Sequence, residues 1–238
     1  MAFRSSASAN ANSGVVTATP AGVVAGDYLG WFVTIDDNGA PTEGGPTGWT
    51  AQLNEGLVLQ EQSAINYYDK IAVGGDSFSS PSAATFIGVI AVAFSGRNTG
   101  GTLAAAKTFQ TGTKDDTLLG TPVSAALTGG TAAQGDDLLY LCCGDKAHIS
   151  NTWSWSTISG FTNQDTESDF SDHTQNFQYQ ANVSAGATGT LTSTVTTGAG
   201  SLQGFGGVVI AVAAGVATEY VGPIYAQGHS PMIGRRYV

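Results

Sequence analysis

The acidic stretch NQDTESDFSDH, residues 163–173, has residue types that suit a metal-binding site. It carries four carboxylates, at Asp165, Glu167, Asp169 and Asp172. Carboxylate oxygens that converge in one loop are ligands that Ca²⁺ prefers. The stretch lacks the glycine and the spacing of an EF-hand loop, and a charge run of this kind is usually solvated. We therefore expect an acidic surface loop, with a calcium site at these four residues as the weaker alternative.

The motif WSWS, residues 153–156, places two tryptophans two positions apart. In a strand, alternate residues share one face, so Trp153 and Trp155 would point the same way. An exposed pair could stack on sugars and make a glycan contact, whereas a buried pair would belong to the core. Tryptophan is highly buried on average, which favours the core and leaves the glycan contact as the alternative.

The histidines and cysteines form no pattern typical of catalysis. His148, His173 and His229 are scattered, and Cys142 and Cys143 are adjacent. Adjacent residues of a strand face opposite sides, so these thiols are not expected to pair; we interpret them as buried thiols of a protein made in a reducing cytoplasm. The sequence has no zinc-ligand spacing, no nucleophile elbow and no phosphate-binding loop. It therefore predicts no enzyme activity and no cofactor.

The composition favours short strands over helices and excludes several partners. Charged residues make up only 11% of the chain, and its 33 glycines accompany abundant Thr and Val. A net charge of −10 opposes phosphate binding, so we expect no nucleic-acid partner. No run of roughly 20 apolar residues is present, and the first residues do not resemble a secretory signal. We therefore expect no association with a membrane.

An internal repeat gives the organisation of the chain. The tetrapeptide IAVA occurs at 90–93 and again at 210–213. Other features recur in the same order: a Gly-Asp turn (26–27 and 135–136), a Gly-aromatic-Thr triplet (48–50 and 160–162), an aromatic strand (66–73 and 177–183) and a Ser/Thr-rich strand (77–85 and 189–197). The sequence therefore predicts two half-motifs, at about 12–97 and 113–215.

Neither half alone could bury the apolar face of its sheet away from water, so we expect the two halves to pack together in one sandwich. We expect a β-sandwich domain over 12–215, a flexible N-terminal segment over 1–11 and an extended C-terminal arm over 216–238. The repeated apolar strand should be the central strand of each half. Further strands are expected at 14–24 and 118–128, where Pro20 and Pro122 should lie at a sheet margin.

The first half carries a resemblance to a known family. The segments PAGVVAGDYL at 20–29, GWT at 48–50, YYDKIA at 67–72 and GVIAVAFSG at 88–96 resemble β-rich proteins encoded in the structural gene clusters of tailed bacteriophages. The resemblance covers about residues 12–215, and it is weaker in the second half, where Phe161 replaces Trp49. It implies a jelly-roll-like sandwich in a virion component that assembles in the host cytoplasm and has no assigned catalysis.

The arm 216–238 combines apolar anchors with two of the eight basic residues of the chain. Its contact residues should be Tyr225, Ile233, Arg235, Arg236 and Tyr237. Arginine forks bind carboxylates, so the arm could dock on an acidic neighbouring subunit, whereas a frayed tail is the alternative.

Two functions follow as expectations. The first is a capsid decoration or cement-like protein that holds the major capsid protein through non-covalent contacts. We expect it to be a homo-oligomer, and only virion architecture suggests that the oligomer is a trimer. The second is a tail-associated module that binds a receptor or glycan beside other tail proteins.

Overall fold

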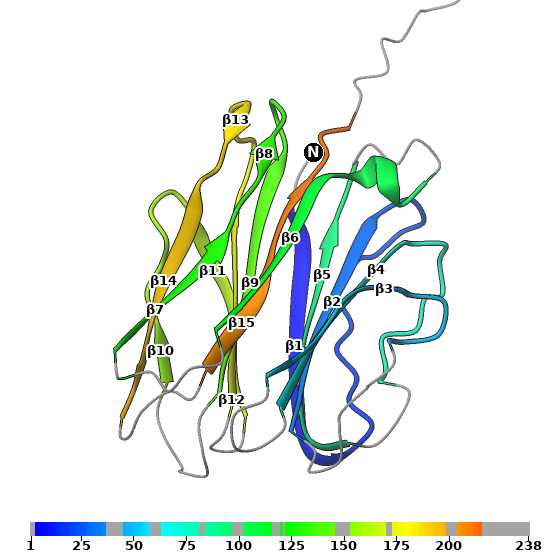
Figure 1. Cartoon of the computed structure of the whole chain (residues 1–238). Helices are drawn as coiled ribbons and strands as arrows, with labels where there is room; N and C mark the ends of the chain where they lie inside the picture. The colour runs from blue at the N-terminus through cyan, green and yellow to red at the C-terminus, as the bar shows by residue number, and fades with distance from the viewer. Residues whose placement is uncertain are drawn as a thin grey trace, which may run out of the picture.

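The computed structural model describes residues 3–36, 45–57, 63–80, 84–96, 102–115, 120, 122–145, 153–169, 173–198 and 204–215. These residues form fifteen β-strands and one 3-10 turn, and all strand pairs are antiparallel. The predicted all-β sandwich is therefore confirmed. Figure 1 shows its layers side by side.

The first half of the chain forms one five-stranded sheet. Its strands are β1 (Phe3–Gly14), β2 (Tyr28–Asp36), β3 (Thr50–Leu57), β4 (Ser63–Ile71) and β5 (Ala84–Phe94), in the order β1-β5-β2-β4-β3. The described side chains of β2 and β5 are apolar almost throughout, because both faces of these strands are covered. Residues 3–14 thus form an edge strand, and the expectation of a flexible segment over residues 1–11 is wrong for the described part.

The second half forms a five-stranded sheet of the same topology. After the short turn η1 (Ala104–Ala106) come β6 (Lys107–Asp115), β9 (Asp137–Asp145), β11 (Thr162–Asp169), β12 (His173–Gln180) and β15 (Gly204–Val212), in the order β11-β12-β9-β15-β6. Each strand has a counterpart in the first sheet: β6 corresponds to β1, β9 to β2, β11 to β3, β12 to β4 and β15 to β5. The predicted duplication is therefore confirmed, but the strands of the two halves begin at Phe3 and Lys107, earlier than the predicted starts at about 12 and 113.

The two Gly-Asp turns are equivalent in detail. Gly26 and Gly135 have φ angles of 91° and 85°, in the left-handed region that glycine adopts readily. The carboxylates of Asp27 and Asp136 each accept a backbone amide three residues upstream, at 2.9 and 2.8 Å. Each turn also exchanges two backbone hydrogen bonds with a residue that follows the neighbouring strand, Ala72 after β4 and Val183 after β12, as expected of a duplicated building block.

The strand register shows that the repeated tetrapeptides are not at equivalent positions. Tyr28 follows the first Gly-Asp turn and pairs with Phe94, whereas Asp137 follows the second and pairs with Val212. Phe94 therefore corresponds to Val212, and the IAVA copies are offset by two residues. An offset of two keeps each side chain on the same face of the sheet. The sequence analysis expected the repeated strand at the centre of each half. Instead, β5 and β15 each lie next to the middle strand of their sheet, which is β2 in the first sheet and β9 in the second.

A third sheet lies on the outer face of the second one (Figure 1). It consists of β7 (Val123–Thr128), β10 (Trp153–Trp155) and β14 (Thr190–Thr197), in the order β10-β14-β7. The small pair β8 (Thr131–Ala132) and β13 (Gly186–Ala187) stands beside it. In the described part of the first half, the corresponding segments make only a single bridge, between Thr17 and Ser79. The strand expected over 14–24 is therefore reduced to that bridge.

The two prolines that were expected at a sheet margin, Pro20 and Pro122, lie outside the hydrogen-bonded strand ladders. Pro20 is buried in the segment that follows β1, and Pro122 is exposed immediately before β7, an edge strand of the third sheet. Proline lacks a backbone donor, so both positions avoid a lost ladder bond.

Three apolar clusters hold the layers together. The central cluster lies between the two five-stranded sheets and includes Phe32, Ile90, Leu141 and Val208. A second cluster fills the space under the third sheet, and a third covers the outer face of the first sheet. The jelly-roll-like path of the prediction is not established by this topology, because each five-stranded sheet comes from one half of the chain.

Candidate functional site

The tryptophan pair belongs to the core under the third sheet. Trp155 is only 8% exposed, and its indole Nε1 donates a hydrogen bond to Thr174 Oγ1 at 2.9 Å. Trp153 is half-buried and packs against the same cluster. The two rings therefore do not form the exposed platform that stacking on a sugar requires.

The acidic stretch is a strand and not the expected loop. Residues 162–169 form β11, which pairs along its length with β12 and has a bulge between Asn163 and Asp165. The side chains of Asp165, Glu167 and Asp169, and all of Asp172, lie outside the described residues. Within the described part of the chain, no three His, Cys, Asp or Glu side chains are grouped to hold a metal. The calcium site stays a prediction.

The predicted docking residues of the C-terminal arm, Tyr225, Ile233, Arg235, Arg236 and Tyr237, also lie outside the described residues. Docking of the arm stays a prediction.

The two cysteines lie as the strand interpretation predicts. Cys142 faces the cluster under the third sheet, whereas Cys143 faces the central cluster, and both are free and fully buried. Burial raises the pKa of the Cys142 thiol to about 12, so it is protonated at neutral pH.

A buried polar cluster, which the sequence analysis missed, connects the two halves. Lys107 at the start of β6 places its Nζ 2.5 Å from Oδ2 of Asp69 on β4. The Asp69 side chain is fully buried and that of Lys107 is 11% exposed. The Lys107 Nζ also donates to Gln110 Oε1 at 2.9 Å. We call Lys107, Asp69, Tyr28 and Tyr67 the Lys-Asp-Tyr cluster.

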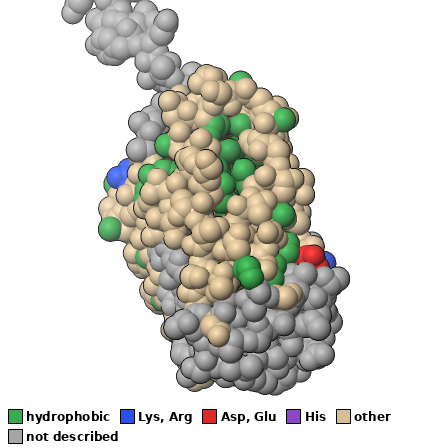
Figure 2. Space-filling view, turned by 90° about the vertical axis from the view of Figure 1, so that its left-hand side faces the viewer, with side chains coloured by type: hydrophobic (Ala, Val, Ile, Leu, Met, Phe, Trp, Pro, Cys, Tyr) green, Lys and Arg blue, Asp and Glu red, His purple; other side chains and the backbone are tan. Residues whose placement is uncertain are grey.

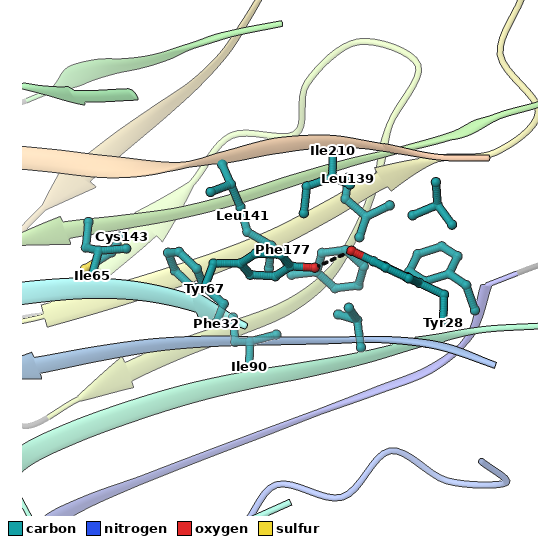
Figure 3. Packing of buried hydrophobic residues seen from close by; sticks show 14 of the residues in the cluster. Tyr28, Phe32, Ile65, Tyr67, Ile90, Leu139, Leu141, Cys143, Phe177 and Ile210 are labelled. Carbon is teal, nitrogen blue, oxygen red and sulfur yellow. Dashed lines mark hydrogen bonds between the residues drawn. The ribbon is translucent and has the colours of Figure 1, made fainter. Parts of the chain in front are cut away.

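Two tyrosines complete the cluster from the first sheet. The Tyr28 hydroxyl donates to Asp69 Oδ2 at 3.0 Å and lies 2.8 Å from the Tyr67 hydroxyl. Figure 3 shows these two rings pointing at each other between the sheets, with their hydroxyl contact dashed. Burial, reinforced by the nearby Asp69, raises the pKa of both tyrosines well above the usual value, so both are neutral.

A glycine makes room for this arrangement. Gly30 on β2 is opposite Asp69, and a Cβ atom added at Gly30 would lie 2.5 Å from the Tyr67 hydroxyl and 2.9 Å from Val92. No side chain fits there without displacing its neighbours. Gly30 therefore determines where the Tyr67 hydroxyl can sit.

The electrostatics of Asp69 set it apart from ordinary surface carboxylates. Burial raises its pKa, and the hydrogen bonds and charge of Lys107, together with Tyr28 and Gln52, oppose that rise only in part. The protonated, neutral form of the carboxyl is thus more accessible than in water.

The positions that the duplication makes equivalent to Lys107 and Asp69 are occupied by aromatic residues. By the strand registers, Phe3 corresponds to Lys107 and Tyr179 to Asp69. Phe3 and Tyr179 stack at 4.6 Å, and Phe94 and Phe177 pack around them. The aromatic set therefore lies on the β1 and β12 side of the central interface, whereas the Lys-Asp-Tyr cluster lies on its β4 and β6 side, and Phe94 and Tyr28 are in register between them. The sequence contained a signal for the Lys-Asp-Tyr cluster. Asp69 is two residues after Tyr67 and so shares its strand face, which places a carboxylate at a core position.

A second polar contact also crosses the central interface. Gln175 Nε2 on β12 donates to Thr34 Oγ1 and to the Gly88 carbonyl, at 2.8 and 2.9 Å. In the duplicate, this contact is replaced by the apolar pair Ile65 and Cys143, which Figure 3 shows close together. Polar cross-links of this kind fix the relative position of the two sheets.

A shallow groove of roughly 570 Å³ opens between the edge strands β6 and β7. It is lined by small and polar side chains together with Lys114, Asp115 and Phe205. Lys114 and Asp115 have interactions of their own, so the groove presents no free charge pair for a ligand.

Comparison of the chain with protein-family models, curated proteins and solved structures finds no match. In the described part of the structure, no helix has the length and apolar character needed to cross a membrane.

Proposed function

We propose that this chain is a structural protein of a bacteriophage particle, a capsid decoration or cement-like subunit that acts through non-covalent contacts. The observation that carries the proposal is the outer face of the third sheet. Strands β7, β10 and β14 contain no Asp, Glu, Lys, Arg or His.

Alternation along these strands divides their side chains between two faces. Leu191, Ser193 and Val195 of β14 are buried against the second sheet. Apart from Ala126, the outward positions carry hydroxyl groups: Thr190, Thr192, Thr194, Thr196, Ser124, Thr128 and Ser154. Figure 2 looks onto this side of the molecule and shows no charged side chain over its centre.

A charge-free face suits a subunit contact in an acidic protein. The chain has a net charge of −10, so copies that approached through acidic surfaces would repel one another. Charged residues are depleted at the centres of protein interfaces because their desolvation is costly. The outer face of the third sheet avoids both costs, and it therefore supports a contact with capsid subunits or with another copy.

The test places a charge on this face. Thr192→Glu puts a carboxylate at an exposed position of β14, and Val24→Glu puts one at a 51% exposed position of the first half. We expect Thr192→Glu to abolish co-sedimentation of the purified protein with empty phage heads, whereas Val24→Glu binds normally. Equal binding of both variants, with both folded by circular dichroism, would contradict the proposal.

The second candidate, a tail-associated or receptor-binding module, makes a different prediction in the same experiment. It expects binding to host cells or purified surface glycans and none to heads. The burial of Trp155 removes the aromatic platform that favoured this alternative, so we rank the capsid role first.

A further inference from the structure

The Lys-Asp-Tyr cluster brings an amine and a carboxyl group into contact between the two sheets. Lys107 and Asp69 are 38 positions apart, and they belong to different halves of the duplicated sandwich. We propose that the Lys107 Nζ and the Asp69 carboxyl condense into an isopeptide bond, which joins the two halves covalently.

The reaction is balanced without any other reactant. One proton of the Lys107 ammonium moves to the Asp69 carboxylate, leaving a neutral amine and a neutral acid. The amine nitrogen then attacks Cγ of Asp69, so a C–N bond forms. One C–O bond breaks, and its oxygen leaves as water with protons from the acid and the amine. The net change is ammonium plus carboxylate to amide plus water, with no oxidant or activating group.

Burial of the two side chains makes their charged forms costly to keep, because charge is stabilised less in the core than in water. Tyr28 and Tyr67 of the Lys-Asp-Tyr cluster belong to the same buried apolar core as Ala106, Val208 and Val212, and the Asp69 side chain is fully buried beside them. A desolvated lysine amine is a good nucleophile, and loss of two charges removes the cost of keeping them out of water. The fixed positions of the two groups replace a collision in solution by an intramolecular step.

Tyr28 is placed to move the proton. Its hydroxyl donates to Asp69 Oδ2, the same oxygen that Lys107 contacts, and Tyr67 lies in hydrogen-bond contact behind it. This hydroxyl can stabilise the oxygen while the tetrahedral intermediate forms, and it can pass a proton to that oxygen as it leaves. Tyr28 is therefore the catalytic residue of the step.

A second lysine–aspartate pair supplies an internal comparison. The Lys70 Nζ lies 2.6 Å from Oδ1 of Asp76, but Asp76 also accepts the backbone amides of Val73 and Gly74. Burial would raise the pKa of Asp76, yet these donors outweigh it and leave the pKa below the usual value. Asp76 is thus held as a carboxylate, a poor electrophile, and we expect no condensation there.

The experiment measures the mass of the full-length chain under denaturing, reducing conditions. We expect a mass lower than the sequence mass by one water. Peptide mapping should recover the peptide containing Lys107 attached to the peptide containing Asp69, with no tryptic cleavage after Lys107. An unmodified mass, or a loss of water that maps to Lys70 and Asp76 or elsewhere, would overturn the proposal.

Single-residue variants test which groups react, and their masses can be measured on the denatured chain. Lys107→Arg keeps a cation beside Asp69 but removes the amine, so the chain should have its full sequence mass. Lys70→Arg, the matched control, should still lack one water. Tyr28→Phe should leave a larger fraction of the chain unreacted, measured by intact mass at times after synthesis. A water loss that persists in Lys107→Arg would overturn the bond, and complete reaction of Tyr28→Phe would overturn the role of Tyr28.

Discussion

At the residue scale, the structure depends on a few positions where a side chain faces an unusual environment. Gly30 is one, because its missing Cβ creates the space that the Tyr67 hydroxyl occupies. Asp76 is another, because several donors converge on one carboxylate. For each of these positions, we predict the effect of one substitution on stability.

Gly30→Ala should destabilise the fold by crowding. The new Cβ would meet the Tyr67 hydroxyl at 2.5 Å and Val92 at 2.9 Å. Overpacking of a well-filled core costs about 1–3 kcal/mol. Urea unfolding should show this loss, whereas Gly120→Ala, at a glycine with no atom within 4 Å of the added Cβ, should be nearly neutral. Equal stabilities of the two variants would show that the space at Gly30 is not needed.

Asp76→Asn should reduce stability in a pH-dependent way. The folded-state pKa of Asp76 is lowered, so its carboxylate stabilises the fold above the ordinary carboxyl pKa and loses that effect as the pH falls through the folded-state pKa. We expect a loss of about 1 kcal/mol at neutral pH, in line with a partly screened, charge-assisted contact. Urea denaturation of both proteins at neutral pH and in acid should show the difference shrinking on acidification. A constant difference would contradict this origin.

The two cysteines should be inert in the native protein. Cys142 and Cys143 are fully buried, and the raised pKa of Cys142 keeps its thiol protonated. Only thiolates react rapidly with aromatic disulfide reagents. We expect no labelling at neutral pH until the protein is unfolded in guanidinium, after which two thiols should titrate. Rapid labelling of the native chain would mean that the second sheet opens.

At the element scale, the duplication is visible in the irregularities as well as in the regular strands. The edge strands β1 and β6 have bulges at Arg4 and Thr108, and β3 and β11 have bulges at Gln52 and Gln164. Bulges re-aim side chains and protect sheet edges. Their equivalent positions indicate that both halves use the same way of ending a sheet.

The third sheet should depend strongly on Trp155. This side chain is 8% exposed, packs in the cluster under the third sheet and anchors to Thr174. Truncation of a buried tryptophan costs about 3–5 kcal/mol. Trp155→Ala should therefore lower the midpoint of urea unfolding, and hydrogen exchange should show selective loss of protection in β10 and β14. A uniform loss over all three sheets would mean that the third sheet does not unfold separately.

At the scale of the whole molecule, the two halves meet as an approximate two-fold pair. Strand β1 lies against β11, and β3 lies against β6, the equivalent combination. The central cluster takes side chains from both halves, so each half alone would expose one apolar face.

The halves should therefore need each other. We expect residues 1–100 or 101–238 expressed alone to aggregate, and the two co-expressed fragments to elute as one complex in size-exclusion chromatography. On a denaturing gel, a covalent band of the summed size would additionally report the Lys107–Asp69 bond. A soluble, monomeric 1–100 fragment would contradict the shared core.

The sequence predicted the strands, the Gly-Asp turns and the duplication, because these depend on residue spacing over short distances. It also predicted the opposite faces of Cys142 and Cys143 from alternation alone. It failed at β11, where a polar strand at a sheet edge lacks the apolar alternation that marks half-buried strands.

By itself, the sequence determined that this chain is an all-β protein built from two similar halves, since turn residues and periodicity act locally. Only the tertiary structure decided the two-residue offset between the repeated tetrapeptides, the third sheet and the meeting of Lys107 with Asp69. These features depend on which faces pack together. That choice is made by the burial of apolar surface over the whole molecule, and local propensity cannot specify it.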